Sequence, residues 1–335
     1  MTMHLWKTVS NDDLFRRERF AITVHKERYL LVAGGFNEVE WRNSAVILDL
    51  QTGKSTKLPD LPPLCDYSSG VVLQGCFYVV GGRQNIFRID LSTRKQWEKM
   101  NVLQHEHSLL SDGSNLYVLN ENLSVMFNPE TKKWVSLPQM RRKRMNYATA
   151  IIGNKIYMMG GVDSEFQIPL STVEIYDIIT QSWSRGPDLP MQLEGAAATV
   201  LGQYVILTGG YNEIDGMTSY CHVFDTIIQE WFRSHVMLPK PCCQHGCVSV
   251  GDSKLVLVVG SEKSPIVTTI NRKHLIPNWC IIGQYLILRK LLDKGRAQMI
   301  IKKNSGSGEE NEESIIHKLF MKLDRDTFCA VISFL

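Results

Sequence analysis

The sequence of 335 residues lacks the marks of several large classes of protein. It has no run of about 18 apolar residues, the length that a membrane-spanning helix requires. Its first residues, MTMHLWKTVSNDD, hold no apolar core of signal-peptide length. An excess of one charge is also missing, because 37 Lys and Arg stand against 34 Asp and Glu, which gives no bulk attraction to nucleic acid. We therefore expect a cytoplasmic protein, or a nuclear one, that binds neither membranes nor nucleic acid.

A metal-binding framework is missing as well. The eight cysteines do not form the pattern of a small disulfide-bonded domain, so we interpret them as reduced, buried thiols. The densest group, CCQHGC, offers four potential zinc ligands: Cys242, Cys243, His245 and Cys247. Zinc sites usually draw their ligands from two separated pairs, whereas these four crowd into one turn and the start of a strand, which favours a structural role. His105 and His107 lack a third ligand. We expect no metal and no other cofactor.

The sequence does contain a repeat. Apolar runs ending in two glycines occur in LLVAGG, FYVVGG, IYMMGG and VILTGG, and these glycines are Gly34, Gly35, Gly81, Gly82, Gly160, Gly161, Gly209 and Gly210. Two degenerate copies, LYVLNE and LVLVVGS, fit the same frame, and successive copies lie about 40 to 50 residues apart. This period is typical of propellers. A glycine pair suits a place where the backbone turns through positive φ, or where another segment approaches closely.

Each copy carries further landmarks in a constant order. A short apolar strand ending in Asp or Asn follows the glycine pair, as in VILDL and EIYDI. In four copies a tryptophan comes six or seven residues later, at Trp97, Trp134, Trp183 and Trp231. A turn with Leu-Pro or Met and a weakly apolar strand such as YATAIIG complete the unit. One unit is therefore predicted to hold four short strands joined by turns.

Together these landmarks resemble the kelch repeat, and the match runs from Trp6 to about Thr269. The tryptophans are never followed by Asp, as they are in WD40 repeats, and the Asp-box of sialidase-like propellers is absent. The resemblance implies an all-β propeller whose blades are four-stranded sheets packed face to face. In such a fold the glycines let the chain turn beside the next blade, and the tryptophans fill the space between sheets. We therefore interpret both residue types as structural.

The N-terminal segment predicts how the ring closes. Trp6 lies 28 residues before Gly34, within the range of 23 to 29 found between a tryptophan and the next pair elsewhere. It thus occupies the outer-strand position of a blade whose other three strands do not precede it. We predict a six-bladed kelch β-propeller in which the N-terminal strand completes the last blade and leaves no unpaired edge. Trp279 is the competing candidate for that last strand, which would make Trp6 the remnant of a truncated upstream blade.

The predicted boundaries follow from these landmarks. We place the propeller at residues 1–274, with blades near 20–58, 66–100, 104–138, 144–189, 194–238 and 244–270, the last joined by the N-terminal strand 4–9. An extension at 275–303 is expected to pack on the ring as a helix, since a seventh blade would place its glycine pair too soon after Gly260. The Gly-, Ser- and Glu-rich stretch 304–313 is predicted to be a linker. Residues 314–335 form an amphipathic segment with helical spacing.

The loops predict where a partner binds. In kelch propellers the loops after the glycine pairs and the loops between successive blades open on the same face. Here they hold two arginine-rich clusters, RRER and RRKR, and several aromatic residues. Arginine and aromatic side chains dominate interface hot spots. We therefore predict a partner-binding face that includes Arg83, Arg141, Arg142, Lys143, Arg144, Trp41, Arg42, Phe166 and Tyr211.

The expected partner is a protein. Arginine suits carboxylate and phosphate groups, so we expect a monomeric propeller that binds an acidic or phosphorylated segment. Resemblance to BTB-kelch adaptors implies that the propeller presents substrates to a ubiquitin ligase. No BTB or BACK region precedes Trp6 in this sequence, so we expect that role to need a separate subunit or the C-terminal segment. A cytoskeletal or general scaffold is compatible with the same residues.

An enzyme is the alternative, since galactose oxidase, the plant specifier proteins and bacterial sialic-acid mutarotases share the repeat. No copper site of tyrosines and histidines can be assigned, and the spacing Glu-x-x-x-Asp-x-x-x-His does not occur. No phosphate-binding loop and no nucleophile with an identifiable base is found. Propeller sites are assembled from several blades and leave no local signature. A sugar mutarotase or oxidase activity in the central channel therefore stays open beside the predicted non-enzymatic module, and we assign no catalytic residue.

Overall fold

The computed structural model describes residues 5–275, except for 38, 63–68, 82–84, 103–107, 122 and 261–264. The chain divides into two units, Met1–Leu275 and Ile276–Leu335. The second unit lies outside the described residues, and with it the predicted extension from residue 276 on, the linker, the amphipathic segment and Trp279. Within the described ranges no helix has the length and apolar character needed to cross a membrane.

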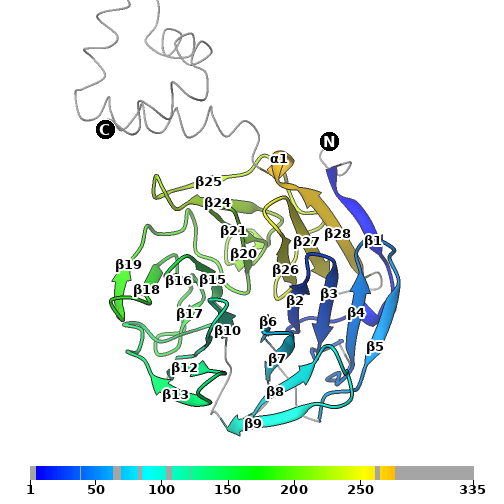
Figure 1. Cartoon of the computed structure of the whole chain (residues 1–335). Coiled ribbons are helices and arrows are strands. Elements are labelled where there is room, and N and C mark those ends of the chain that lie inside the picture. Colours follow the sequence, from blue (N-terminus) through cyan, green and yellow to red (C-terminus); the bar gives the residue numbers. More distant parts are fainter. Residues whose placement is uncertain are drawn as a thin grey trace, which may run out of the picture. The chain divides into compact units, whose positions relative to one another are not determined.

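Six four-stranded antiparallel sheets follow one another around a central axis, as the blades of a propeller (Figure 1). Blade 1 consists of β2 (Ala21–His25), β3 (Tyr29–Ala33), β4 (Ala45–Asp49) and β5 (Ser55–Leu58). Blade 2 consists of β6 (Ser69–Leu73), β7 (Cys76–Gly81), β8 (Asn85–Asp90) and β9 (Glu98–Val102). Blade 3 consists of β10 (Ser108–Ser111), β11 (Leu116–Leu119), β12 (Ser124–Asn128) and β13 (Lys133–Ser136).

The second half of the ring repeats this order. Blade 4 consists of β15 (Ala148–Ile152), β16 (Lys155–Met159), β18 (Val173–Asp177) and β19 (Ser182–Arg185). Blade 5 consists of β20 (Ala197–Leu201), β21 (Tyr204–Thr208), β24 (Cys221–Asp225) and β25 (Glu230–Arg233). Blade 6 consists of β26 (Gly246–Val250), β27 (Lys254–Val259), β28 (Ile266–Asn271) and β1 (Lys7–Ser10). A 3-10 turn at Asp13–Phe15, the short helix α1 (Arg272–Leu275) and two short strand pairs, β14 (Arg144–Met145) with β17 (Val162–Asp163) and β22 (Tyr211–Asn212) with β23 (Gly216–Met217), lie outside these sheets.

The N-terminal strand closes the ring, as the sequence predicts. β1 pairs antiparallel with β28, with Lys7 opposite Thr269 and Thr8 opposite Thr268. The adjacent Trp6 is 8% exposed, and its indole N–H donates to the carbonyl oxygen of Met237 at 2.9 Å. The sixth blade therefore combines three strands from the end of the repeat with one from its beginning, which leaves that sheet edge paired.

The other tryptophans occupy matching places between neighbouring blades. Trp183 is 8% exposed, and its ring lies 5.2 Å from that of Tyr176, centroid to centroid. Its N–H donates to the carbonyl oxygen of Pro138 in the preceding blade at 2.8 Å. Trp97 and Trp231 bond in the same way to the blade before their own. Each indole thus fills an apolar gap and has a partner for its N–H, as a buried tryptophan requires.

The glycine pairs combine the two features that the sequence suggests, a positive φ and the close approach of another segment. Gly160 and Gly161 have φ of +63° and +87°, a region that side chains rarely adopt. A Cβ on Gly160 would lie 2.4 Å from the carbonyl oxygen of Leu193, where the chain reaches the next blade. A Cβ on Gly161 would lie 2.5 Å from the carbonyl oxygen of Met145, just before blade 4. The pair is therefore needed both for its turn and for the close approach of two loops.

Candidate protein-interaction face

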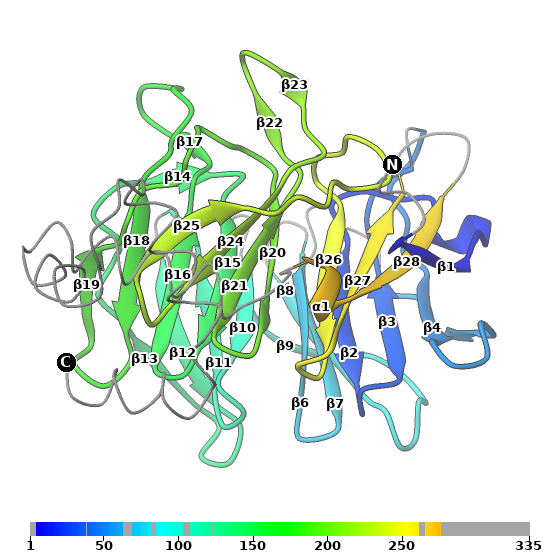
Figure 2. The same cartoon turned by 90° about the horizontal axis from the view of Figure 1, so that it is seen from above.

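The loops after the glycine pairs and the loops between blades meet on one face, which we call the glycine-pair face. In blade 4, β14 (Arg144–Met145) pairs with β17 (Val162–Asp163). In blade 5, Tyr211 bridges to Glu194, and the loop forms the hairpin of β22 (Tyr211–Asn212) and β23 (Gly216–Met217). Figure 2 shows β14, β17, β22 and β23 at the same end of the propeller. The sequence expectation that both groups of loops share a face is confirmed for these blades.

Backbone hydrogen bonds tie the inter-blade loops of four neighbouring blades together. The N–H of Arg19 donates to the oxygen of Gln244 at 3.0 Å, Gln244 donates to Gly195 at 2.7 Å, and Gly195 donates to Asn146 at 2.8 Å. All four residues have positive φ. The loops leading into blades 4, 5, 6 and 1 are therefore held by one another, and they support the glycine-pair face on a fixed frame.

Exposed apolar side chains concentrate on this face. Seven of the eleven large hydrophobic residues that are exposed in the described ranges lie in the glycine-pair loops of blades 1, 4 and 5: Val39, Trp41, Phe166, Ile168, Tyr211, Ile214 and Met217. Ile214 is 93% exposed and Phe166 64%. Asp163 accepts hydrogen bonds from the backbone N–H of Phe166 and of Glu165, each at 2.9 Å, and so fixes the turn below Phe166.

The basic cluster of blade 4 is only partly a surface feature. The side chain of Arg144, predicted to be part of the binding face, is fully buried under the glycine pair. Its Nη1 donates to the carbonyl oxygens of Gly160 at 3.0 Å and Thr172 at 2.8 Å, and its Nη2 lies 2.8 Å from Glu174 Oε1. The expectation of an exposed Arg144 was wrong, because the pairing of β14 with β17 turns this side chain inward.

The neighbours of Arg144 are also engaged within the chain. The Nε of Arg142 lies 2.5 Å from Asp163 Oδ2, and the Arg142 side chain is 40% exposed. The backbone N–H groups of Arg141 and Arg142 donate to the Glu174 carboxylate at 2.8 and 3.2 Å. Arg141 Nη2 also donates to the carbonyl oxygen of Trp183. Arg141 and Lys143 remain exposed. The carboxylates of Asp163 and Glu174 thus balance the charges of Arg142 and Arg144, while those of Arg141 and Lys143 lie at the surface.

Blade 1 has a buried arginine that sequence reasoning missed as an individual residue. Arg17, within the cluster RRER, is 0% exposed. Its Nη1 donates to the carbonyl oxygens of Gly34 and Ser44, each at 2.9 Å. Burial and the charge of Arg42 lower the pKa of Arg17 to about 10. A signal for this role exists in the sequence, because Arg17 and Arg144 precede the first glycine of their pairs by about the same number of residues.

The remaining predicted residues of blade 1 lie together. Trp41 is 41% exposed, and its ring centroid is 5.0 Å from that of Phe36. Arg42 is half-buried, and its backbone N–H donates to the oxygen of Gly35 at 2.7 Å. Arg83, and with it Gly82, lies outside the described residues. The structure therefore groups Trp41 with Arg42 in blade 1, Phe166 with Arg141 to Lys143 in blade 4, and Tyr211 in blade 5.

The group CCQHGC lies in the interior. Cys242 and Cys247 are buried, and burial raises the pKa of Cys247 to about 12. A ring nitrogen of His245 is 2.9 Å from Thr208 Oγ1, and burial lowers the pKa of His245 to about 4. Within the described ranges no three His, Cys, Asp or Glu side chains are placed to hold a metal ion. These residues pack at the start of blade 6.

The innermost strands line a central cavity of about 470 Å³. Its described lining consists of small, aliphatic and hydroxyl residues, with Tyr147 and His245, and includes no carboxylate, lysine or arginine. Neighbouring blades approach closely along these strands, since a Cβ on Gly246 of blade 6 would lie 2.6 Å from the ring of Phe20, which leads into blade 1. Tyr147 and His245 both have partners within the chain, since the Tyr147 hydroxyl donates to the carbonyl oxygen of Leu119 and a ring nitrogen of His245 lies 2.9 Å from Thr208 Oγ1.

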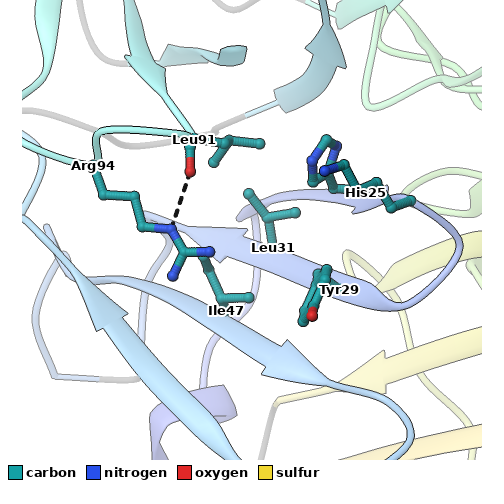
Figure 3. A pocket seen from close by; sticks show the side chains of 7 residues that line it. His25, Tyr29, Leu31, Ile47, Leu91 and Arg94 are labelled. Atoms are coloured by element: carbon teal, nitrogen blue, oxygen red, sulfur yellow. Dashed lines mark hydrogen bonds between the residues drawn. The ribbon is translucent and has the colours of Figure 1, made fainter. Parts of the chain in front are cut away.

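A second cavity, of about 200 Å³, opens between blades 1 and 2 at the ends of the strands remote from the glycine pairs. Figure 3 shows Leu31, Ile47 and Leu91 along it, with Arg94, on the same turn as Leu91, donating to the carbonyl oxygen of that residue at 3.1 Å. Burial, with the charges of Lys26 and Arg94, lowers the pKa of His25. The cavity is small and basic.

Similarity to known proteins agrees with the architecture. The family model for the Kelch motif matches residues 143–190, the part of the chain that forms blade 4. With the six blades of repeated sequence, this match supports a kelch-repeat β-propeller. Kelch-like protein 36 of Mus musculus is 26% identical over 198 residues, which cover 52% of this chain and 32% of that protein. Kelch repeat and BTB domain-containing protein 12 of Danio rerio is 27% identical over 198 residues, which cover 56% and 28%.

A solved structure shares the fold of this kelch propeller. The structure of YjhT aligns with a TM-score of 0.64 at 14% identity, and the alignment covers 76% of this chain and 93% of that one. At this identity the likeness shows the fold alone. The kelch propeller spans about a third of the length of the curated relatives named above.

Proposed function

We propose that this kelch propeller is a non-enzymatic protein-interaction module that docks its partner on the glycine-pair face. The observation that carries the proposal is the concentration of exposed apolar side chains there, on loops of three blades. Full burial of such a side chain contributes about 1.5–3 kcal/mol. Exposed apolar groups gathered on one face mark interaction sites more often than scattered ones do. The hydrogen-bonded inter-blade loops hold these groups in place before the partner arrives.

The proposed partner contributes an acidic or phosphorylated segment. Exposed basic side chains at Arg141 and Lys143, and the half-buried Arg42, lie beside the apolar loops. Their charges suit carboxylate or phosphate groups. Charges at the rim of an interface are screened within about 8 Å at physiological ionic strength. Binding is therefore expected to weaken as salt rises.

The similarity to kelch proteins with a BTB domain supports a role as the substrate-binding part of a ubiquitin-ligase adaptor. On this proposal a monomeric propeller in the cytoplasm, or the nucleus, recognises the substrate, and a BTB-containing subunit or region connects it to the ligase. A scaffold of the cytoskeleton would use the same face. The recovery of a cullin-type subunit together with the partner distinguishes the adaptor from the scaffold.

The test compares two double variants with the unmodified chain. Ile214→Ser with Met217→Ser changes the exposed hairpin of blade 5. Ile179→Ser with Ile227→Ser is the matched control, because these residues are 72% and 67% exposed and follow the ends of β18 and β24 remote from the glycine pairs. All three proteins are expected to melt alike.

After crosslinking in cells and affinity capture, we expect the recovered amount of a specific partner protein to be at least tenfold lower with the Ile214/Met217 variant than with the unmodified chain. With the control variant we expect it to be unchanged. If every captured protein is recovered equally by both variants, or is lost only from the control, the proposed docking face is wrong.

A further inference from the structure

Blades 1 and 4 hold a buried arginine in the same hydrogen-bonding frame. Arg17 donates to the oxygens of Gly34 and Ser44, as Arg144 donates to the equivalent glycine and to Thr172. The hydroxyl groups of Ser44 and Thr172 accept the second arm of each guanidinium, at 2.9 and 3.2 Å. The two arginines are therefore equivalent positions of the repeat, and differences around them are meaningful.

The surroundings of Arg17 lack the carboxylates of blade 4. Glu174, which pairs with Arg144, is the second residue of β18, and the second residue of β4 is Val46, which is 0% exposed. Asp163, which pairs with Arg142, is replaced by Asn37, whose Oδ1 accepts from two backbone N–H groups of its loop just as Asp163 Oδ1 does. Both acidic positions of blade 4 are thus neutral in blade 1.

Blade 1 adds a second cation at a position where blade 4 is apolar. The backbone N–H of Arg42 donates to the second glycine of its pair at 2.7 Å, and the backbone N–H of Leu170 makes the same bond in blade 4 at 2.8 Å. Leu170 is 3% exposed, whereas Arg42 is half-buried. In the part of the chain that the structure describes, neither Arg17 nor Arg42 has an ion-pair partner.

This arrangement places two positive charges together in a partly dehydrated site. A buried charge without an opposite charge is unfavourable, and a second like charge adds to the cost. The Nε–H groups of Arg17 and Arg42 are both buried and have no acceptor among the described residues. The Nε–H of Arg144 is also without an acceptor, so the difference between the blades lies in charge rather than in hydrogen-bond number. An anion bound at Arg42 would supply the negative charge that blade 4 has and blade 1 lacks at these positions.

We propose that Arg42, with Arg17 behind it, forms an anion subsite of the glycine-pair face, and that it receives a carboxylate or phosphate group of the docked protein segment. The inference rests on the proposed function for the identity of that partner. Because Arg42 is only half-buried, an anion from solvent reaches the pair there. The rings of Trp41 and Phe36, whose centroids lie 5.0 Å apart, supply an apolar wall for the aliphatic part of the partner's side chain. Arg142 and Arg144 of blade 4 do not form such a subsite, because Asp163 and Glu174 already pair with them.

The test uses inorganic phosphate as the probe and the melting temperature as the readout. Melting in phosphate is compared with melting in sodium chloride at equal ionic strength and neutral pH. Phosphate also stabilises proteins without binding, through exclusion from their surface, so variants provide the reference. Arg42→Gln removes the proposed site, and Arg142→Gln is the matched control, since it removes a half-buried arginine of blade 4. Arg42→Leu, which copies Leu170, is a second variant in case the first is poorly folded.

We expect a saturable, phosphate-specific rise on the order of 2 °C for the unmodified chain and for Arg142→Gln, and its loss in both Arg42 variants. An equal rise in the unmodified chain and the Arg42 variants, or a loss in Arg142→Gln alone, overturns the anion subsite. Either result leaves the capture experiment with Ile214 and Met217 unaffected, so failure of the subsite is distinct from failure of the docking face. Conversely, a phosphate rise that depends on Arg42 supports the subsite even if no captured partner depends on the hairpin.

Discussion

Blades 1 and 4 of this propeller carry an arginine at the same point of the repeat and balance its charge in different ways. In blade 4, Arg144 meets Glu174 inside the protein at 2.8 Å. In blade 1, the acceptors of Arg17 among the described residues are uncharged oxygens, and the positive charge of Arg42 contributes to lowering its pKa. The hydrogen bonds that hold the glycine pair are the same in both blades. The two blades differ in the net charge that surrounds the buried arginine.

The difference shows which positions of a repeat protein can vary from blade to blade. Positions that support the glycine pair and the inter-sheet tryptophans are set by packing, so they recur from blade to blade. The residue that neutralises the supporting arginine makes none of the bonds to the glycine pair, so one blade can use Glu174 where another uses Val46. A blade that leaves its arginine unbalanced gains a site for an outside anion, and binding specificity can be added there without altering the scaffold.

The largest expected effect contrasts a tryptophan of blade 4 with one of blade 1. Trp183→Ala is expected to lower the free energy of unfolding by about 3–5 kcal/mol, because it empties a buried aromatic site. Trp41→Ala is expected to change it by about 0.5 kcal/mol or less, because Trp41 is 41% exposed in a loop. Urea unfolding of the two variants measures both values. Similar losses would show that the division into scaffold and surface tryptophans is wrong.

Substitution of each buried arginine compares what its charge contributes to stability in the two blades. Arg144→Met is expected to lower the free energy of unfolding by about 3–5 kcal/mol, because it leaves the buried Glu174 without its partner. Arg17→Met strands no carboxylate and removes the repulsion from Arg42, so its loss is expected to be smaller by at least about 1 kcal/mol. Reversal of Arg144 to Glu, which a surface location would tolerate, is expected to unfold the blade. A larger loss for Arg17→Met in urea unfolding would contradict the charge assignment.

The same position in a third blade predicts a pH dependence. His222 is the second residue of β24, where blade 4 has Glu174, and it is 2% exposed without a partner for either ring nitrogen among the described residues. Burial, with the charge of Arg233, lowers the pKa of His222 to about 4. Because a histidine in the unfolded chain has a pKa of about 6.5, protonation favours unfolding, and stability present above that pH is lost as the pH falls toward 4.

We expect the free energy of unfolding to fall by about 2–3 kcal/mol for His222 between pH 7 and pH 4, with a similar contribution from the buried His245. Urea midpoints measured across this range test the prediction. The variant His222→Phe is expected to show a shallower decline than the unmodified chain. A decline of equal size in both proteins would remove His222 as its cause.

The sequence predicts the scaffold better than the binding surface, and the reason is physical. Gly160, Gly161 and Trp183 sit where packing permits few alternatives, so their spacing alone predicts the blades and the closure by the N-terminal strand. Arg144 shows the limit of such reasoning, because a run of four basic residues does not reveal which side chain turns inward. That choice depends on the pairing of β14 with β17. The similar distance of Arg17 and Arg144 from their glycine pairs was the available signal.

The most direct test of the central claim exchanges charge between the two blades at equivalent positions. Asn37→Asp adds to the loop of Arg42 the carboxylate that blade 4 has, and Asp163→Asn removes that carboxylate from blade 4. Both changes keep the oxygen that caps the loop N–H groups. The measurement is the phosphate-specific rise in melting temperature at constant ionic strength. We predict that Asn37→Asp suppresses the rise and that Asp163→Asn preserves or increases it. An undiminished rise in Asn37→Asp would contradict the claim that the unbalanced charge of blade 1 forms the anion site.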